Sequence, residues 1–554
     1  MSPSAGCSIL NRSAFHMQNG FFLPFFLNWC FFSLYVKNLF SLYPLNHQMN
    51  KIMNESNISP TYEQFCERSD QARLVPVAGR FISDLDTPLT LFSKIHKNRE
   101  HVFLFESMEG GEKWGRYSFI GFDPLVTFVS TDSNITVTST LDDGYEIENL
   151  TGNPILYLRK LVKDMNAWED PELPRFCGGL VGYLGYEMVR YMEELPDSHE
   201  GLDIPDTSFM IPGTVLVHDS FGQTVTIVHW VDSSSQANTG QAYHQAVSHI
   251  DSVFELIGRP VPEEYSRQDS KGAPSKSEYS ANMEPDEFHE MVKKAKEYIL
   301  AGDIFQVVLS QRFHTKTKIS PFSIYRALRY INPSPYLFFL KFKDLVQIGS
   351  SPEILVRKEG NSIELRPIAG TRPRGKTADE DRALEEELLA DPKERAEHLM
   401  LVDLGRNDVG RVAKGGSVEV RDLLVVERYS HVMHIVSGVH GIIDDGYDQF
   451  DVVNACFPAG TVSGAPKIRA MEIIDELEQE RRGPYAGSVG YFGFSGNMDF
   501  CITIRTFIMQ GDDLWVQAGA GIVADSDPHR EFEETVNKSM GLRRALELAE
   551  KRFS

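Results

Sequence analysis

Three β-rich segments near the C-terminus, joined by very short connections, most constrain how this chain can fold. The segments are 484–494, 499–509 and 513–524. Their connections contain Ser-Gly-Asn-Met and Gln-Gly-Asp-Asp, which are rich in turn-forming residues, so the segments should pair as an antiparallel meander. Alternation along the middle segment predicts that four of its side chains share one face: Cys501, Thr503, Arg505 and Phe507.

Two long helical patterns, at 391–412 and 527–552, flank this meander. Strand hairpins with helices outside them indicate an α+β fold, since a Rossmann-type fold alternates single strands with helices. No internal repeat is visible in the sequence.

Composition divides the chain into regions. Residues 53–270 mix short β-rich runs with helical stretches, and 260–283 are poor in apolar residues and rich in Ser, Lys, Glu and Pro, which is typical of a linker. The region 284–554 begins with an amphipathic helical pattern that runs into a strand. We therefore expect an N-terminal domain over 53–270 and a C-terminal domain over 284–554, with the boundary near 270.

The first 52 residues do not match the rest. Residues 21–45 are apolar, but Pro24 and Lys37 interrupt them, and a spanning helix needs about 20 predominantly apolar residues. No small-residue cleavage site follows. Met49 or Met53 is the preferred true start, so residues 1–52 are interpreted as an extension from a mis-assigned start codon. A signal anchor is the alternative.

The net charge of -23 excludes whole classes of partner. So acidic a surface repels nucleic acid and anionic membranes, and we expect neither as a partner. An anionic substrate must therefore be bound by local arginines and backbone amides. The six cysteines form no CxxC pair and no zinc-type spacing, which indicates reduced thiols in a cytoplasmic protein.

Two acidic helix faces could bind a metal ion. Glu531, Glu534 and Lys538 share one face of the last helix, and Glu394 and Glu397 lie three apart on the other. Mg²⁺ prefers such carboxylates together with ligand oxygens and waters. The same spacing also suits solvated Glu–Lys pairs, and spacing alone leaves both interpretations open.

The glycine-rich segments are weak signals individually. Residues 459–467 are not a Walker A loop, because the spacing to Lys467 is wrong and Pro466 lacks an amide donor. The glycines of 517–521 lie within a strand, where they indicate either a close ligand or tight packing against a bulky neighbour. His434 and Glu353 are single titratable residues in apolar surroundings, and neither indicates a function unaided.

The segment 366–375, RPIAGTRPRG, is the most unusual. Three arginines stand around a Gly-Thr pair, as if to bind an anion, and they are Arg366, Arg372 and Arg374. The residue before the glycine is the inert Ala369.

Taken in order, the motifs of the second half resemble those of the chorismate-utilising enzymes, and among them the anthranilate synthase component I group. They include GDIFQVVLSQRF, NPSPYLFF, GSSPEILV, RPIAGTRPRG, PAGTVSGAPKIRAME, FCITIRTF, VQAGAGIVADSDP and EFEETVNK. The likeness extends to FLFESMEGGEKWGRYSFIG (103–121) and covers nearly everything after residue 53. It implies large antiparallel sheets packed as a sandwich with helices outside.

The resemblance also implies a set of ligand-binding residues. Mg²⁺ would be held by Glu397 and Glu534, with Glu531 in support, and would bind the ring carboxylate of chorismate. The second carboxylate would meet Arg505 and Tyr485. Further substrate contacts are expected at Gly370, Thr371, Thr461, Gly519, Ala520, Gly521 and Lys538.

The reaction that the resemblance implies adds ammonia at C2 of the ring, expels the C4 hydroxyl and then eliminates pyruvate to leave anthranilate. Hydroxide is a poor leaving group, so an acid is needed, and Glu353 matches that position. His434 matches the histidine associated with pyruvate release.

Two residues argue against the nearest relatives. Aminodeoxychorismate synthase carries a nucleophilic lysine where this chain has Ala369. Isochorismate and salicylate synthases carry a basic lysine where this chain has Gln306, which is not basic. The alternatives are an aminodeoxychorismate synthase without that lysine, or a non-catalytic relative that binds tryptophan or a partner.

The resemblance finally implies partners. No Gly-x-Cys-x-Gly elbow is present, so a separate glutamine amidotransferase subunit should supply ammonia, in an assembly of two large and two small subunits. Tryptophan is expected as a feedback inhibitor of this first step of its biosynthesis. Its site would include Ser107, Pro335, Tyr336 and Leu337, and Phe105 replaces the family's usual leucine.

Overall fold

The computed structural model describes residues 57–108, 115–141, 146–234, 239–266, 277–429 and 432–553. Residues 56–554 form one compact unit. The extension 1–52, with its alternative start codons, lies outside the described residues, as do residues 267–276 of the predicted linker. Within the described ranges, no helix is both long and apolar enough to cross a membrane.

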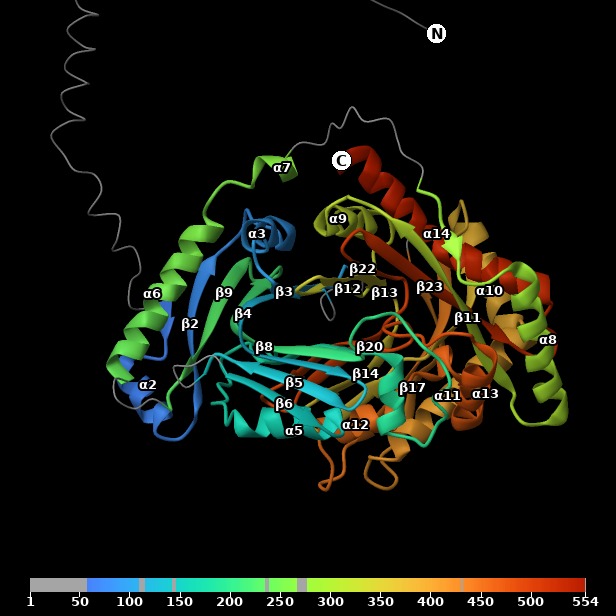
Figure 1. Cartoon of the computed structure of the whole chain (residues 1–554), viewed down its shortest axis with the longest axis horizontal. Coiled ribbons are helices and arrows are strands. Elements are labelled where there is room, and N and C mark those ends of the chain that lie inside the picture. Colours follow the sequence, from blue (N-terminus) through green and yellow to red (C-terminus); the bar gives the residue numbers. More distant parts are fainter. Residues whose placement is uncertain are drawn as a thin grey trace, which may run out of the picture. The chain divides into compact units, whose positions relative to one another are not determined.

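The strands form one continuous network of 23 strands, in which neighbours pair antiparallel (Figure 1). Up to the predicted linker, the strands are β1 (Ile58–Ser59), β2 (Leu74–Ile82), β3 (His101–Glu106), β4 (Tyr117–Thr131), β5 (Asn134–Ser139), β6 (Glu146–Thr151), β7 (Gly179–Leu184), β8 (Thr207–Asp219) and β9 (Thr224–Asp232). The helices there are α2 (Tyr62–Ser69), α3 (Pro88–Ile95), α5 (Pro154–Asp164), the 3-10 helix η2 (Tyr186–Tyr191), α6 (Thr239–Ile257) and α7 (Glu263–Ser266).

The second half of the chain supplies the remaining strands. They are β10 (Ser280–Ala281), β11 (Gln306–Lys316), β12 (Tyr336–Phe342), β13 (Leu345–Ser351), β14 (Ile354–Glu359), β15 (Ser362–Leu365), β16 (Ile368–Pro373), β17 (Glu419–Arg428), β18 (Val432–Ile442), β19 (Gly464–Ala465), β20 (Ser488–Gly493), β21 (Met498–Ile502), β22 (Thr506–Gln510) and β23 (Asp513–Ile522). The helices are α8 (Pro285–Ala301), α9 (Pro321–Ile331), α10 (Ala378–Ala390), α11 (Pro392–Gly410), α12 (Gln449–Cys456), η4 (Gly460–Val462), α13 (Lys467–Leu477) and α14 (Pro528–Phe553).

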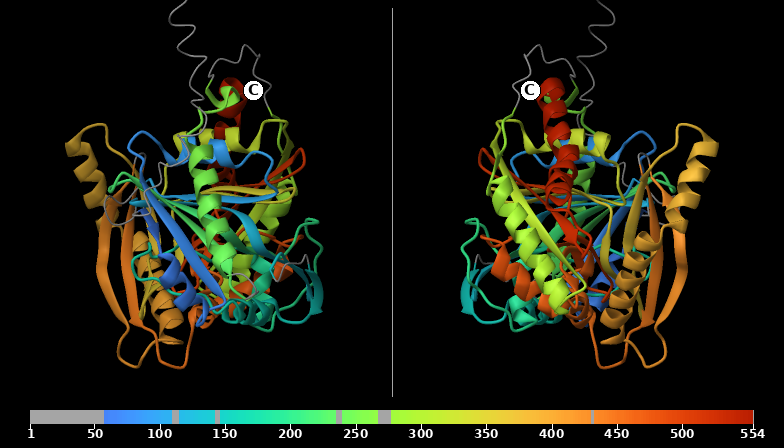
Figure 2. Two further views of the ribbon diagram at one scale, coloured as in Figure 1. Left: turned by 90° about the vertical axis from the view of Figure 1, so that its left-hand side faces the viewer. Right: turned by 90° about the vertical axis from the view of Figure 1, so that its right-hand side faces the viewer.

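Helices cover the strands from outside, so the predicted α+β fold is confirmed. In Figure 1, α6 runs along β2 and β9, while α14 and α8 cover β23 and β11. Figure 2 shows the orange strands β17 and β18 at one side of the unit, where α11 packs against β16 and β18. The helices predicted at 391–412 and 527–552 are α11 and α14.

Strands from both sides of the predicted linker pair with each other. β12 pairs with β3, with Phe338 opposite Phe105, and β20 pairs with β7, with Gly490 opposite Gly182. The two sequence regions therefore share one hydrogen-bonded sheet. Their division into separate domains near residue 270 stays a prediction.

The predicted single strand 499–509 is in fact two strands, β21 and β22, because the backbone breaks at residues 503–505. Arg505 has a φ of 50°, in the left-handed region, where a pleated strand cannot continue. The expectation that Cys501 and Arg505 share a strand face is therefore wrong. β21 pairs with β14 and β22 pairs with β13, so the partner strand breaks at the same level, at Glu353.

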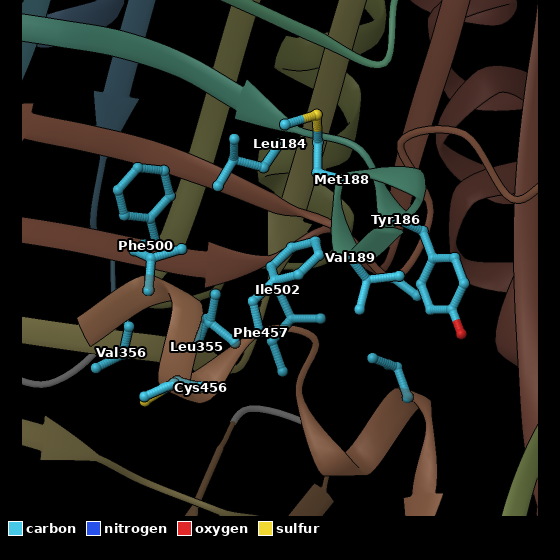
Figure 3. Close-up of a cluster of buried hydrophobic side chains, with 14 of the residues drawn as sticks. Leu184, Tyr186, Met188, Val189, Leu355, Val356, Cys456, Phe457, Phe500 and Ile502 are labelled. Atoms are coloured by element: carbon cyan, nitrogen blue, oxygen red, sulfur yellow. The ribbon is translucent and has the colours of Figure 1, made fainter. Parts of the chain in front are cut away.

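Apolar side chains anchor the strands behind this break. Figure 3 shows Leu355 and Val356 of β14 close to Phe500 and Ile502 of β21, with Phe457 beside them. All five are buried. Burying side chains of this size stabilises the fold by about 1.5–3 kcal/mol each. The break is thus set in a rigid, well-packed part of the sheet.

Candidate active site

Glu353 lies at the break between β13 and β14 and is 7% exposed. Its backbone carbonyl accepts a hydrogen bond from Ile502 N–H at 3.0 Å, across the break. Burial raises the pKa of its carboxyl to about 8, although the nearby Thr461 hydroxyl and the charge of Arg505 act in the opposite direction. A carboxyl with this pKa is protonated at neutral pH and can donate a proton.

Glu353 and Thr461 line one cavity of about 370 Å³. Strand β14, helix α11 and the 3-10 helix η4 enclose it. Its lining residues are Glu353, Ile354, Leu355, Leu365, Arg366, Pro367, Leu401, Leu404, Gly405, Asp408, Cys456, Ala459, Gly460 and Thr461. The cavity therefore brings the predicted acid and one predicted substrate contact to the same space.

Arg505 lies across the break from Glu353. Its carbonyl accepts a hydrogen bond from Ser350 N–H at 3.2 Å, which holds the left-handed turn against β13. The charge of Arg505 also lowers the pKa values of both Glu353 and His434. The arginine is thus within electrostatic reach of both predicted catalytic residues.

His434, on β18, is held by the Gly-Thr pair of the unusual segment. Its Nδ1 lies 3.0 Å from Gly370 O and 3.0 Å from the Thr371 hydroxyl. A carbonyl oxygen can only accept, so Nδ1 carries the proton and Nε2 of the neutral ring keeps its lone pair. Burial lowers the pKa of this imidazole, so the ring is neutral at pH 7.

A bulge in β16 turns the Gly370 carbonyl towards this histidine. Gly370 has a φ of 69°, and a Cβ there would lie 3.1 Å from Leu388 and 3.2 Å from a carboxylate oxygen of Glu394. The ladder with β18 shifts between Ala369 and Thr371. The positive φ therefore favours glycine, and a Cβ would also fit tightly against these two side chains.

The three arginines of the same segment bind carboxylates of the protein itself. Arg366 hydrogen-bonds to Glu427, Arg374 makes a fork with Asp381, and Arg372 contacts three carboxylates on α10 and α11 or between them. Those three are Glu387, Asp391 and Glu394. The interpretation that this segment is equipped to bind an anion is therefore wrong, because the guanidinium groups tie β16 to its neighbours.

Of the two explanations that the sequence left open for the glycines of β23, tight packing is confirmed, and a close ligand stays a prediction. A Cβ on Gly519 would lie 2.7 Å from the Tyr485 hydroxyl, and one on Gly521 would lie 2.6 Å from the Gln306 amide nitrogen. These glycines thus accommodate close neighbours, as tight packing predicts. The neighbours are Tyr485, a predicted substrate contact, and Gln306, which differs from the lysine of the isochorismate synthases.

The alternating direction of backbone N–H groups along β23 decides which of its amides could donate a hydrogen bond to a ligand. On β11, Val308 N–H binds Ser463 O and Ser310 N–H binds Glu478, so both point away from β23. Their partners across the ladder are Gly521 and Gly519. In an antiparallel pair these are non-hydrogen-bonded positions, so the amides of the two glycines face the open edge, whereas the Ala520 amide faces β11. The Ala520 amide is therefore engaged within the sheet, and a substrate contact at Ala520 stays a prediction.

The predicted metal ligands lie on α11 and α14. Glu397 accepts a hydrogen bond from Gln306 Nε2 at 3.0 Å, and burial raises its pKa. Burial raises the pKa of Glu531 as well, and the neighbouring Glu534 adds to the rise. Lys538 lies 2.7 Å from Glu534 and donates to Gly519 O at 3.0 Å. The intrahelical Glu–Lys pair is thus present beside the acidic cluster.

These residues fit a magnesium ion that takes most of its ligands from elsewhere. In the described part of the chain, no group of three or more His, Cys, Asp or Glu side chains is placed to hold a metal. Mg²⁺ needs only one or two protein carboxylates when substrate and water complete its shell. The raised pKa values of Glu397 and Glu531 mean that their charges lack a sufficient counter-charge, which a cation would supply.

All four predicted tryptophan contacts line a second cavity, of about 560 Å³. Six of its sixteen lining residues are aromatic, and an Asp–Arg–Tyr cluster lies at one side. Its lining residues are Phe105, Glu106, Ser107, Tyr117, Phe119, Arg175, Pro335, Tyr336, Leu337, Phe338, Arg357, Val489, Gly490, Tyr491, Asp499 and Cys501. Phe105, which replaces the family's leucine, lies in this wall.

Short hydrogen-bonded links join the second cavity to the break in the sheet. Ser334, next to the cavity residue Pro335, donates to the carbonyl of Ser351, and Asn332 donates to Ser350 Oγ at 3.0 Å. Ser350 and Ser351 immediately precede the turn to Glu353. On the other strand, only a few residues separate Cys501, which lines the cavity, from the 503–505 break.

Comparison with known proteins decides the family. A model of chorismate binding enzymes matches residues 100–544. The chain is 48% identical to anthranilate synthase component 1 of Aquifex aeolicus over 502 residues, covering 89% of this chain and 99% of that protein. It is 46% identical to the protein of the same name from Acetivibrio thermocellus over 493 residues, covering 88% and 99%.

The chain belongs to the chorismate binding enzyme family. The crystal structure of anthranilate synthase component I from Streptococcus pneumoniae TIGR4 superposes with a TM-score of 0.68 at 36% identity, over 79% of this chain and 95% of that chain. The menaquinone-specific isochorismate synthase of Escherichia coli has a TM-score of 0.65 at 18% identity, over 88% and 98%, and shares the fold. The expected resemblance is confirmed.

Sequence reasoning missed several contacts of this chorismate binding enzyme. The Gln306–Glu397 hydrogen bond joins residues 91 positions apart, and no local pattern announces it. In the second cavity, Arg357 donates to Asp499 at 2.9 Å, and the Tyr336 hydroxyl donates to the same carboxylate at 2.9 Å. Arg357 directly follows three apolar residues of β14, and no alternation in that strand marks it as a buried charge.

The geometry predicts the protonation state of His434. In protein labelled with ¹⁵N at histidine, the ring should be neutral at pH 7, because burial lowers its pKa, and it should carry its proton on Nδ1, because the Gly370 carbonyl can only accept. Long-range ¹H–¹⁵N NMR spectra report both properties, and the signal is assigned by its loss in His434→Gln. Thr371→Val should keep the same tautomer. A charged ring at pH 7, or a proton on Nε2, would contradict the assignment.

Proposed function

We propose that this chain is the chorismate-consuming component of an anthranilate synthase, a lyase that converts chorismate and ammonia to anthranilate and pyruvate. The observation that carries the proposal is the buried Glu353 carboxyl, with a pKa near 8, across the sheet break from Arg505. The names and high coverage of the relatives support the same activity. The substrate would bind between the break, the open edge of β23 and the Gly370 bulge.

In this proposal, Arg505 and the Tyr485 hydroxyl bind one carboxylate of chorismate, assisted by the amides of Gly519 and Gly521. Fixed donors of this kind cost no reorganisation when the reaction proceeds. Thr461, Gly370 and Thr371 provide further substrate contacts, and they lie beside Glu353 and His434. Lys538, which already contacts Gly519 O, adds positive charge at the same edge.

The protonated Glu353 would donate its proton to the C4 hydroxyl as ammonia attacks C2, so that the leaving group departs as water. General acid assistance of this type accelerates a reaction by about 10²–10⁴-fold. In the second step, the C2 proton must be removed while the bond to the enolpyruvyl oxygen breaks. The unprotonated Nε2 of His434 is suited to accept that proton.

Magnesium would be held by Glu397 and Glu534, with Glu531 in support. When bound, the ion supplies positive charge for the ring carboxylate of chorismate. The Gln306 amide orients Glu397 for this role through its 3.0 Å hydrogen bond.

Ala369 and Gln306 favour direct attack by ammonia over the reactions of the related enzymes. Ala369 cannot form a covalent bond with the ring, which an amine at that position could do. The Gln306 side chain is not basic, and its amide nitrogen is already engaged with Glu397, so it cannot activate a water. Ala369 thus argues against a covalent lysine adduct at C2, and Gln306 argues against water as the nucleophile there.

Ammonia would come from a separate glutamine amidotransferase subunit, in an assembly of two large and two small subunits. The relatives are named component 1, and this name supports the existence of a second component. The described cysteines, Cys66, Cys177, Cys456 and Cys501, are free thiols, which supports a cytoplasmic location.

The second cavity would bind tryptophan as the feedback inhibitor. Its aromatic wall suits an indole ring, and Glu106, Ser107 and the carbonyl groups around Pro335 suit an amino group. The links from Ser334 to Ser351, and from Ser350 to Arg505, would carry the effect of tryptophan to the break. Inhibition would follow from a shifted Glu353 or Arg505.

Purified protein supplied with chorismate, magnesium and ammonium should form anthranilate and pyruvate in equal amounts. Glu353→Gln keeps the shape of the side chain but removes the acidic proton, so kcat should fall by about 10²–10⁴-fold with little change in the KM for chorismate. The matched control Glu364→Gln, on the neighbouring strand β15, should retain full activity.

Three outcomes would contradict this proposal. Aminodeoxychorismate or isochorismate as the product would mean that Ala369 and Gln306 do not decide the chemistry. Full activity of Glu353→Gln would remove the acid role. An absence of turnover in the wild type, with tryptophan still bound, would indicate a regulatory relative.

The hydrogen-bonded link between the two cavities predicts that a variant can still bind tryptophan and yet be inhibited by it less strongly. Ser334→Ala removes the hydrogen bond to Ser351. The coupling factor, defined as the ratio of the KM for chorismate with saturating tryptophan to the KM without it, should therefore be roughly 2- to 30-fold smaller in this variant than in the wild type. The dissociation constant of tryptophan, measured by calorimetry, should change little. Ser362→Ala, an exposed serine of β15, is the control. An unchanged coupling factor in Ser334→Ala would refute this path.

A further inference from the structure

A third cavity, of about 370 Å³, lies between the 3-10 helix η2 and the end of helix α13. None of the residues assigned above to substrate, metal or tryptophan lines it. Its lining residues are Tyr186, Glu187, Val189, Arg190, Leu195, Pro196, His199, Met471, Ile474, Asp475, Glu478, Glu480, Arg481 and Arg482. Four of these are acidic and three are arginines.

The charged side chains of this cavity pair with one another or with residues nearby, with one exception. Arg190 binds Asp475 at 2.9 Å, and Arg482 binds Glu478 at 2.5 Å. Arg481 binds Asp197 at 2.7 Å, and Glu480 binds Arg312 at 2.8 Å. For Glu187, the nearest guanidinium nitrogen is Nη1 of Arg190, at 4.0 Å. Glu187 is therefore the acidic residue of the cavity whose charge is least compensated.

Two buried oxygen atoms in this cavity lack a hydrogen-bond partner among the described residues. They are Oε2 of Glu187 and the hydroxyl of Tyr186, and both residues are only 5% exposed. The other oxygen of Glu187 accepts from Arg482 N–H at 2.9 Å, which fixes the carboxylate. In Figure 3 the Tyr186 hydroxyl points away from the apolar side chains around it. Buried oxygens left in this way require a donor, since each costs about 1–3 kcal/mol unpaired.

The electrostatics of the cavity favour binding of a cation. Burial raises the pKa of Glu187 to about 7, and the nearby Asp206 raises it further, while Arg190 and the Arg482 amide lower it. A small cation that donates hydrogen bonds would satisfy both oxygens and the charge together. His199 does not compete for this place, because its Nε2 lies 2.7 Å from the Asp475 carbonyl.

The side chain of Arg482 reaches from this cavity to residues of the proposed substrate site. The guanidinium of Arg482 lies 4.8 Å from the ring of Tyr186 and 5.6 Å from the ring of Tyr485. It donates to Val462 O at 2.7 Å, next to Thr461. Arg482 also lines a further cavity of about 320 Å³ that it shares with Tyr485 and Thr503. The third cavity therefore adjoins two predicted substrate contacts.

We propose that the third cavity binds ammonium, the protonated form of the nitrogen donor, through the Glu187 carboxylate and the Tyr186 hydroxyl, beside the substrate site. The inference rests on the proposed function for the identity of the donor. The binding site itself rests on the two unpartnered oxygens and their charge. Its strength should therefore depend on Glu187 whether or not turnover occurs.

Kinetics test the role of the site in the ammonia-dependent reaction. Glu187→Gln should raise the KM for ammonium by about 10- to 100-fold, because a charge-assisted hydrogen bond is lost, while the KM for chorismate and the kcat stay near wild type. Tyr186→Phe should raise the KM for ammonium less, and it provides a second test if Glu187→Gln fails to fold. The control is Glu194→Gln, an exposed glutamate close by in the chain.

Crystallography tests binding without turnover. Crystals soaked in thallium(I), a heavy monovalent cation that replaces ammonium, should show an anomalous peak beside Glu187, and this peak should be absent in Glu187→Gln. Only a water at that position, with no thallium peak, would overturn the site. A thallium peak with an unchanged KM for ammonium in both variants would overturn its role in the reaction. A wild type that binds thallium but forms no product would reject the proposed function and keep the site.

Discussion

The structure depends on a paired interruption in its central sheet. Two neighbouring strands break at the same level, and two backbone hydrogen bonds bridge the gap, from Ile502 N–H to Glu353 O and from Ser350 N–H to Arg505 O. In a continuous strand, the side chains of successive residues would point alternately to the two faces of the sheet. The break instead releases Glu353 and Arg505 from the strand geometry, while the apolar side chains behind it keep the position rigid.

The same interruption explains the open edge of β23. Because β22 begins only at Thr506, it pairs with β23 no further than Val516, and the glycines beyond it have β11 on one side alone. Two outward-facing amides result, next to Tyr485 and Lys538. The break also lies close to the second cavity, because Arg357 of β14 and Cys501 of β21 line that cavity. In the proposed function, one local feature therefore positions the acid Glu353, frees the two backbone amides of β23 and lies on the route for regulation.

The sequence allowed much of this arrangement to be predicted where the signal is local. Helices α11 and α14 begin at Asp-Pro pairs, in which Asp391 and Asp527 accept hydrogen bonds from the first turn, so their starts could be located closely. The motifs that matched the family also brought Glu353 and Thr461 into one cavity, and His434 beside Thr371.

Long-range contacts could not be predicted. The strand break has no sequence mark, because the residue in the left-handed conformation is Arg505 and not a glycine. The arginines of the 366–375 segment were expected to bind an anion because the sequence does not show that they pair with carboxylates on other elements, such as Glu427 and Asp381. The direction of the Ala520 amide could not be predicted either, because it is set by pairing with β11, more than 200 positions earlier in the chain.

The central claim is that the break holds Glu353 buried and protonated at neutral pH, and the carboxyl carbon of this residue reports it directly. Protein labelled with ¹³C at the glutamate side-chain carboxyl, with Glu353 assigned through Glu353→Gln, can be titrated by NMR without substrate. The account predicts a protonated carboxyl at pH 7 that ionises near pH 8, as its pKa of about 8 requires. A carboxyl already ionised at pH 6 would contradict it.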